Sequence, residues 1–135
     1  MRKIEHIGIA VADLEKSNEL FAKLFNVDGP YKEEIVDAAF VKTSFFRSGN
    51  NKIELVQGLN ENNAISKFIE KRGEGIHHIA FDVADIKQEM NRLKGEGFIL
   101  LQEEPMQGAD NKLVCFVHPK SSNGVLIELC QEIPS

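Results

Sequence analysis

The sequence predicts an α+β protein built from two tandem βαβββ modules that form a cupped, mixed sheet. Strand-like and helix-like segments follow one another in the same order in both halves of the chain. The stretch "HIGIAVADL" near the N-terminus returns as "HIAFDVADI", and "KIELVQ" returns as "LIELCQ" near the end. We therefore expect residues 1–135 to form a single domain, with module 1 at about 1–59 and module 2 at about 74–135.

The first module opens with a strand and a helix. Apolar residues alternate along Ile4–Val11, as in a strand with one buried face, and Asp13 is a plausible helix cap. The residues at helical spacing after this cap are Leu14, Leu20, Phe21, Leu24 and Phe25. Turn residues such as "SGNN" then separate three strand-like runs, at about 31–36, 39–46 and 52–57.

The second module repeats this order after a short helix that carries Ile65, Phe68 and Ile69. Its first strand begins at Ile76, and its helix begins at Asp85 with Gln88 three residues later, a pair that resembles a capping box. The glycines of "KGEGF" end that helix, and three more strands follow.

The two halves align with almost constant spacing. The matched pairs are His6–His78 and Asp13–Asp85 at an offset of 72 (78 − 6), and Glu54–Glu128 and Gln57–Gln131 at 74 (128 − 54). Two copies are too few for a solenoid, because each repeat needs neighbours to bury its apolar face. The repeat therefore predicts a pseudo-symmetric pair of curved sheets that face one cavity.

Composition narrows the classes of function. A chain of 135 residues with 42% hydrophobic and 27% charged residues suits one globular domain with its own core. The net charge of −5, without a basic stripe, argues against a nucleic-acid partner. No apolar run is long enough for a membrane helix and no signal-peptide pattern opens the chain, so we expect a cytoplasmic protein. Cys115 and Cys130 lack CxxC spacing and are interpreted as buried, reduced thiols.

Polar side chains repeat at equivalent places in the apolar strands. Because side chains alternate in a strand, His6 and His78 lie on the face opposite the apolar residues that follow them, whereas His77 shares the apolar face. Glu54 and Glu128 each stand between two apolar neighbours and face away from them. The repeat therefore predicts two imidazoles and two carboxylates in one cavity.

This set of side chains suits a divalent metal ion. Mixed nitrogen and oxygen ligands favour Co, Mn, Ni, Zn or Fe(II) with positions left open, and the lack of thiolates disfavours a closed structural zinc site. The alternative is that the histidines are capped core residues and the glutamates are solvated. Recurrence of the whole set in both halves favours the metal site.

Four motifs resemble a known family over nearly the whole chain: "HIGIAVADLEKS", "KIELVQGL", "GIHHIAFDV" and "HPKSSNGVLIEL". They are similar to the vicinal oxygen chelate (glyoxalase/bleomycin resistance/dioxygenase) superfamily and, within it, to the methylmalonyl-CoA epimerase family. The resemblance implies a glyoxalase-like fold whose cupped sheet surrounds a metal site. It also implies His6, His78 and Glu128 as metal ligands, with Glu54 where relatives carry Gln or Glu.

The resemblance implies divalent-metal-dependent epimerisation of methylmalonyl-CoA, by proton removal and return through a metal-stabilised enolate. Inversion needs two acid/base groups, and Glu128 is the first candidate. Relatives carry the second carboxylate on a strand that here reads "FVKTSFF", with Lys42, Thr43 and Ser44, so Glu54 becomes the second candidate. The nearby acids are interpreted as a solvated face: Glu33, Glu34 and Asp37.

The segment "HPKSSNG" offers one further candidate. Lys120 lies in this loop and would contact a phosphate of coenzyme A, although loop lysines are usually only solvated. Pro119 and Gly124 are interpreted as turn residues that set the register of the final strand. We expect an acyl-CoA substrate and a homodimer, with no nucleic acid or membrane partner.

Two other functions remain open. A glyoxalase I-like lactoylglutathione lyase would use the same His and Glu spacing, but "HPKSSNGVLIEL" stands where those enzymes usually carry a DPDG-like turn. A metal-free small-molecule binding module would share the fold, and the metal content of the purified protein distinguishes it. A ring-cleaving dioxygenase is disfavoured, because those sites use two histidines and one carboxylate and belong to longer chains.

Overall fold

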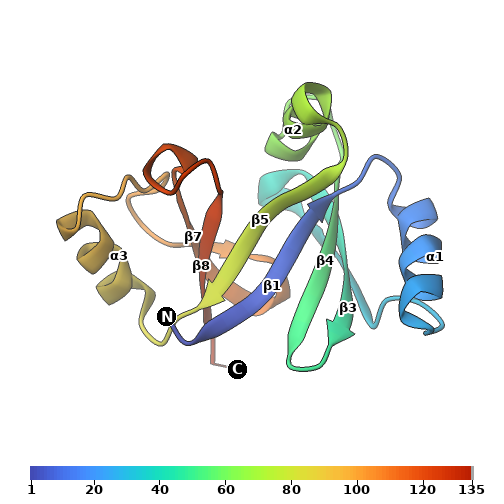
Figure 1. Cartoon of the computed structure of the whole chain (residues 1–135), viewed down its shortest axis with the longest axis horizontal. Coiled ribbons are helices and arrows are strands. Elements are labelled where there is room, and N and C mark those ends of the chain that lie inside the picture. Colours follow the sequence, from blue (N-terminus) through green and yellow to red (C-terminus); the bar gives the residue numbers. More distant parts are fainter. Residues whose placement is uncertain (135) are drawn as a thin grey trace. The chain divides into compact units, whose positions relative to one another are not determined.

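The computed structural model describes residues 1–134, which fall into two compact units. Unit 1 consists of Met1–His6 and the chain from His78 onward, and unit 2 is Ile7–His77. Both boundaries lie inside strands, namely β1 (Lys3–Ala10) and β5 (Gly75–Asp82). Figure 1 follows the chain through these elements. Each unit therefore holds most of one predicted module together with part of the first strand.

Unit 2 carries the helices and strands of the first module. They are α1 (Leu14–Phe25), β2 (Lys32–Val36), the 3₁₀ turn η1 (Asp37–Ala39), β3 (Val41–Ser48), β4 (Asn51–Gly58) and α2 (Ala64–Arg72). The strand order here is β2-β3-β4-β1, and the β2/β3 and β3/β4 pairs are antiparallel. The strand expected from residue 39 begins at Val41, because η1 is followed by Phe40 in a left-handed conformation with φ 53°.

Unit 1 carries the elements of the second module. They are α3 (Ile86–Gly95), β6 (Met106–Gly108), the 3₁₀ turn η2 (Ala109–Asn111), β7 (Lys112–Val117), the 3₁₀ turn η3 (Pro119–Ser121) and β8 (Ile127–Glu132). The strand order is β1-β5-β8-β7-β6, with β8 parallel to β5 and antiparallel to β7. The mixed sheet confirms the predicted α+β class with two βαβββ modules.

The start of α1 has two separate hydrogen-bond acceptors. Asp13 is the N-cap, and its carboxylate accepts from the backbone N–H of Lys16 at 3.2 Å. The Gln57 side chain, from β4, accepts from the backbone N–H of Leu14 at 2.7 Å. These oxygens satisfy amide groups that the first turn of a helix leaves unpaired, and they tie α1 to its strand.

The start of α3 is built in the same way. Asp85 accepts from the backbone N–H of Gln88 at 3.1 Å, and Gln131 of β8 accepts from the backbone N–H of Ile86 at 2.8 Å. The predicted cap is therefore confirmed. The glutamine of the last strand in each module, which the repeat also matches, plays the same role in both.

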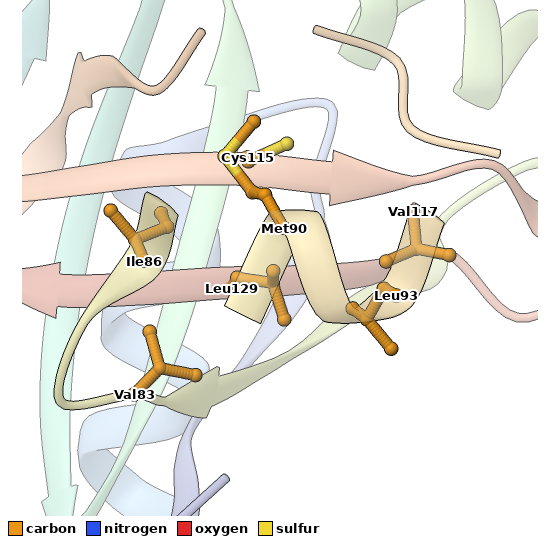
Figure 2. Close-up of a cluster of buried hydrophobic side chains, with 7 residues drawn as sticks. All are labelled: Val83, Ile86, Met90, Leu93, Cys115, Val117 and Leu129. Atoms are coloured by element: carbon orange, nitrogen blue, oxygen red, sulfur yellow. The ribbon is translucent and has the colours of Figure 1, made fainter. Parts of the chain in front are cut away.

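Each of these helices covers the apolar face of its own strands. The cluster under α1 is Val11, Leu14, Ala22, Phe46 and Leu55. The cluster under α3, which Figure 2 draws, is Val83, Ile86, Met90, Leu93, Cys115, Val117 and Leu129. Both cysteines are buried free thiols, as predicted, and burial raises the pKa of each.

The apolar stripe predicted for α1 is partly wrong. Leu20 and Leu24 are 63% and 69% exposed, whereas Leu14, Phe21 and Phe25 pack toward the sheet. At about 100° of rotation per residue, the two exposed leucines lie about a third of a turn from the side that packs.

Among the described residues, no helix combines the length and the apolar character that crossing a membrane requires.

Candidate metal centre

Two buried histidines form the centre of a polar site in unit 1. His6 of β1 and His78 of β5 are 6% and 5% exposed. Their Nε2 atoms are 3.1 Å apart, and their rings are nearly perpendicular at 88°. Ala80, on the same strand face as His78, packs with Val114 and Cys130 and not in the cluster under α3, as the predicted alternation requires.

Glu128 brings a carboxylate to the same place. It lies on β8 opposite Ala80 of β5 in the parallel register and is 6% exposed. Its Oε1 is 3.3 Å from the Nε2 of His78, and its Oε2 is 3.7 Å from the Nε2 of His6. Three side chains that were predicted from the sequence therefore converge within unit 1.

The spacing of these atoms fits one divalent ion. With metal–ligand bonds of about 2.1 Å, ligand atoms stand about 3.0 Å apart in an octahedral site and about 3.4 Å apart in a tetrahedral one. The 3.1 Å between the two Nε2 atoms and the 3.3 Å from His78 to Oε1 of Glu128 lie between these values, and the 3.7 Å from His6 to Oε2 lies slightly above them. His6, His78 and Glu128 could thus hold a metal through two nitrogen atoms and the carboxylate group.

The charge state of Glu128 suits a ligand. Burial raises the pKa of this carboxyl, but the neighbouring His6 side chain and the positive charge that His78 and His6 can carry outweigh burial. The pKa of Glu128 therefore lies below its usual value. The side chain offers a carboxylate, not a neutral acid, at neutral pH.

Glu5 is a further member of this site that was not predicted from the sequence. Glu5 is 5% exposed, and its Oε1 lies 2.8 Å from the Nδ1 of His6. Glu5 occupies a position of β1 where the alternation predicts an apolar residue, as His77 does in the second half. A charged residue at a position expected to be apolar was the feature of the sequence that could have identified Glu5.

An aromatic ring and a thiol also surround the two histidines. The ring of Phe116 lies 5.8 Å from the ring of His78, edge to face. Ligand atoms of Glu5, His6 and Cys130 lie within 4.8 Å of one another. The Cys130 thiol donates to the backbone carbonyl of Phe81 at 3.5 Å.

Glu54 lies in unit 2, where the predicted orientation is seen. It is 6% exposed and stands opposite Phe45 in the β3/β4 register. Its neighbour Leu55 packs under α1, so Glu54 faces away from that helix. Its assignment as a fourth ligand stays a prediction.

The three polar residues of "FVKTSFF" have separate environments. The Nζ of Lys42 lies 3.6 Å from Glu33, and Ser44 donates to Asn18 at 2.5 Å. Thr43 is 1% exposed, and its hydroxyl has no hydrogen-bond partner among the described residues. None of the three side chains supplies a carboxylate.

Lys120 lies in the η3 turn of unit 1, with an exposed side chain. Its backbone N–H donates to the Nδ1 of His118 at 3.0 Å. Gly124 closes the loop with φ 83° and a backbone hydrogen bond of 2.7 Å to Pro119, as expected for turn residues. The contact between Lys120 and coenzyme A stays a prediction.

His77 belongs to unit 2 and has a packing role there. Its ring lies 5.0 Å from the ring of Phe68 in α2, at an interplanar angle of 84°. The guanidinium of Arg72 lies 5.8 Å from the centre of the same Phe68 ring. These contacts support its interpretation as a structural histidine.

The repeated βαβββ order and the buried His, His and Glu group define a class of two-module α+β proteins that carry a candidate metal site on their strands. The chain belongs to the Glyoxalase/Bleomycin resistance protein/Dioxygenase superfamily, whose family model matches residues 5–116. The predicted glyoxalase-like fold is thereby confirmed.

Individual relatives are similar over nearly the full chain. The ethylmalonyl-CoA/methylmalonyl-CoA epimerase of Cereibacter sphaeroides is 38% identical over 131 residues, which cover 96% of this chain and 97% of the relative. The crystal structure of methylmalonyl-CoA epimerase from Mycobacterium tuberculosis superposes with a TM-score of 0.92 at 34% identity, over 98% of this chain and 89% of that one. A Streptomyces coelicolor methylmalonyl-CoA epimerase variant in complex with 2-nitronate-propionyl-CoA gives 0.92 at 28% identity, over 99% of both chains.

Proposed function

We propose that this protein is a methylmalonyl-CoA epimerase that depends on a divalent metal ion. The observation that carries the proposal is the convergence of His6, His78 and Glu128 at separations of 3.1 to 3.7 Å. Relatives that match almost the entire chain are named as epimerases of malonyl-CoA derivatives. The site and the relatives thus support one reaction.

The reaction is a proton transfer at one carbon. The hydrogen on the carbon between the carboxylate and the thioester carbonyl is acidic. When its C–H bond breaks, the electron pair moves into the carbonyl and forms an enolate. A divalent ion held by His6, His78 and Glu128 would supply Lewis-acid stabilisation of that negative charge. Return of a proton to the opposite face of the carbon inverts the centre.

Two residues of the chain are proposed to carry the proton. Glu128 is a buried carboxylate beside both histidines, and it is proposed to accept the substrate proton as well as to act as a ligand. Glu54 is proposed as the second acid/base group and as the fourth ligand, because it is the repeat counterpart of Glu128. Its burial on the face of β4 away from α1 supports this assignment.

The remaining assignments are also proposals. Lys120, with its exposed side chain in the η3 turn, would pair with a phosphate of coenzyme A through a surface contact that salt weakens. We expect Co, Mn, Ni or Zn as the ion, a homodimer and a cytoplasmic location. Metal analysis of the purified protein and light scattering during size-exclusion chromatography test the first two expectations.

One assay tests the proposed reaction. The protein is incubated with single-epimer methylmalonyl-CoA in deuterated water, and in parallel with ethylmalonyl-CoA and with methylglyoxal plus glutathione. We expect epimerisation with deuterium uptake at the substrate carbon in the first sample and no lactoylglutathione in the third. Absence of exchange with both acyl-CoA substrates in the metal-loaded protein would contradict the proposal.

A further inference from the structure

The residue before His6 is a buried carboxylate that the proposed reaction does not use. Glu5 is 5% exposed, and glutamates are rarely buried to this degree without a partner that compensates the charge. Its Oε1 stands 2.8 Å from the Nδ1 of His6, and this nitrogen lies on the side of the ring away from His78.

This contact decides which nitrogen of His6 is available to a metal. A carboxylate only accepts hydrogen bonds, so Nδ1 carries the hydrogen, and in the neutral ring Nε2 then carries the lone pair. That Nε2 is the atom 3.1 Å from His78 and 3.7 Å from Glu128. The lone pair therefore points to the place where the other two ligand atoms meet.

The repeat offers an internal contrast. The counterpart of Glu5 in the second half is His77, at the same offset of 72 (77 − 5). His77 packs edge to face against Phe68 of α2 and supplies no carboxylate. A carboxylate at this position is thus not a requirement of the βαβββ framework.

We propose that Glu5 is a positioning residue, which fixes the tautomer and ring orientation of His6 so that Nε2 can bind the metal. The inference rests on the proposed function, because it assigns a role toward the same metal site. Carboxylates that support a ligating histidine also make the imidazole more basic, and their loss typically lowers metal affinity by about 10- to 100-fold.

Cys130 defines the competing explanation. Ligand atoms of Glu5, His6 and Cys130 lie within 4.8 Å of one another, so Glu5 could instead be a direct ligand beside a thiolate. The thiol of Cys130 donates to the backbone carbonyl of Phe81 at 3.5 Å. A spectroscopic measurement separates the two roles.

The experiment uses full-length protein stripped of metal and titrated with Co²⁺ in the presence of a competing chelator. Glu5→Gln keeps the size of the side chain but removes its charge, and His77→Gln is the matched control at the equivalent position of the other half. We expect Co²⁺ affinity to fall by about 10- to 100-fold in Glu5→Gln and to stay within about twofold in His77→Gln. Circular dichroism and thermal melting verify that each variant is folded.

Each outcome has a distinct meaning. Wild-type affinity in folded Glu5→Gln would overturn the positioning role and leave the metal site intact. A wild-type protein that binds no divalent ion would overturn the metal site itself, and the inference with it. An intense thiolate-to-cobalt absorption that disappears in Cys130→Ser would place the ion at the cluster of Glu5, His6 and Cys130 and overturn the positioning role.

A conservative variant separates positioning from simple packing. Glu5→Asp keeps the charge but is one methylene shorter, so it should retain more Co²⁺ affinity than Glu5→Gln, although its volume changes more. It also replaces Glu5→Gln if that variant fails to fold. Affinity that follows side-chain volume instead of charge would contradict the proposal.

Discussion

The two modules share the residues that start their helices and differ in the residue before the buried histidine. Asp13 and Gln57 accept hydrogen bonds at the start of α1, and Asp85 and Gln131 do the same at the start of α3. In contrast, Glu5 precedes His6, where His77 precedes His78. The shared residues hold each helix on its strands, as any copy of the framework requires. The difference falls at the candidate metal site, where the two copies need not do the same chemistry.

The first prediction separates the two matched glutamates. Glu128→Gln removes the basic oxygen while keeping the size of the side chain, so the epimerisation rate should fall by about 10²- to 10⁴-fold. Glu54→Gln should retain substantial activity if Glu54 is only a ligand, since an amide oxygen can still bind a metal. Both rates are measured as deuterium exchange at the substrate carbon.

Two results would change this assignment. Near-normal epimerisation by folded Glu128→Gln would contradict its acid/base role. Loss of exchange in Glu54→Gln, with the metal retained, would make Glu54 the essential second base. Each module would then contribute one carboxylate that is essential for proton transfer.

The second prediction concerns the paired histidines. His6→Ala and His78→Ala each remove a nitrogen ligand, so Co²⁺ affinity should fall by more than the roughly 10- to 100-fold typical of a lost supporting group. Metal content after dialysis measures the effect, with His77→Ala as the control that keeps the ion. Unchanged metal content in both ligand variants would show that the histidines are core residues.

The third prediction compares the first residues of the two helices. Leu14 and Ile86 are repeat counterparts that are 2% and 1% exposed. Truncation of either to Ala should lower the free energy of unfolding by about 2–5 kcal/mol, because a buried cavity remains. Leu24→Ala, at a position 69% exposed, is the control and should change it by less than about 0.5 kcal/mol. Urea denaturation measures all three, and equal losses at Leu14 and Leu24 would contradict the observed orientation of α1.

The smallest expected effect tests the shared helix caps. Asp13→Ala and Asp85→Ala should each lower the free energy of unfolding by about 1 kcal/mol, because one helix N–H loses its acceptor. Asn at either position should retain most of the stability. A loss at only one cap would show that the glutamine acceptor compensates in one module and not in the other.

Much of this protein was already determined by the sequence. Period-two alternation placed His6, His78 and Glu128 on the faces opposite their apolar neighbours, and the repeat paired the caps Asp13 and Asp85. Side-chain direction along a strand depends only on local backbone geometry, so the pattern of residues is sufficient to predict it. The order of helices and strands followed from the same local rules.

Tertiary structure decided the features that depend on contacts between distant or differently packed residues. Helical spacing grouped Leu20 and Leu24 with Leu14, but only packing against β3 and β4 determined which side of α1 is buried. Likewise, Glu5 was not predicted as a site residue, whereas the structure buries it against the Nδ1 of His6. The physical reason is that local periodicity limits which face a side chain can take, while burial and hydrogen-bond partners depend on what the folded chain brings to that face.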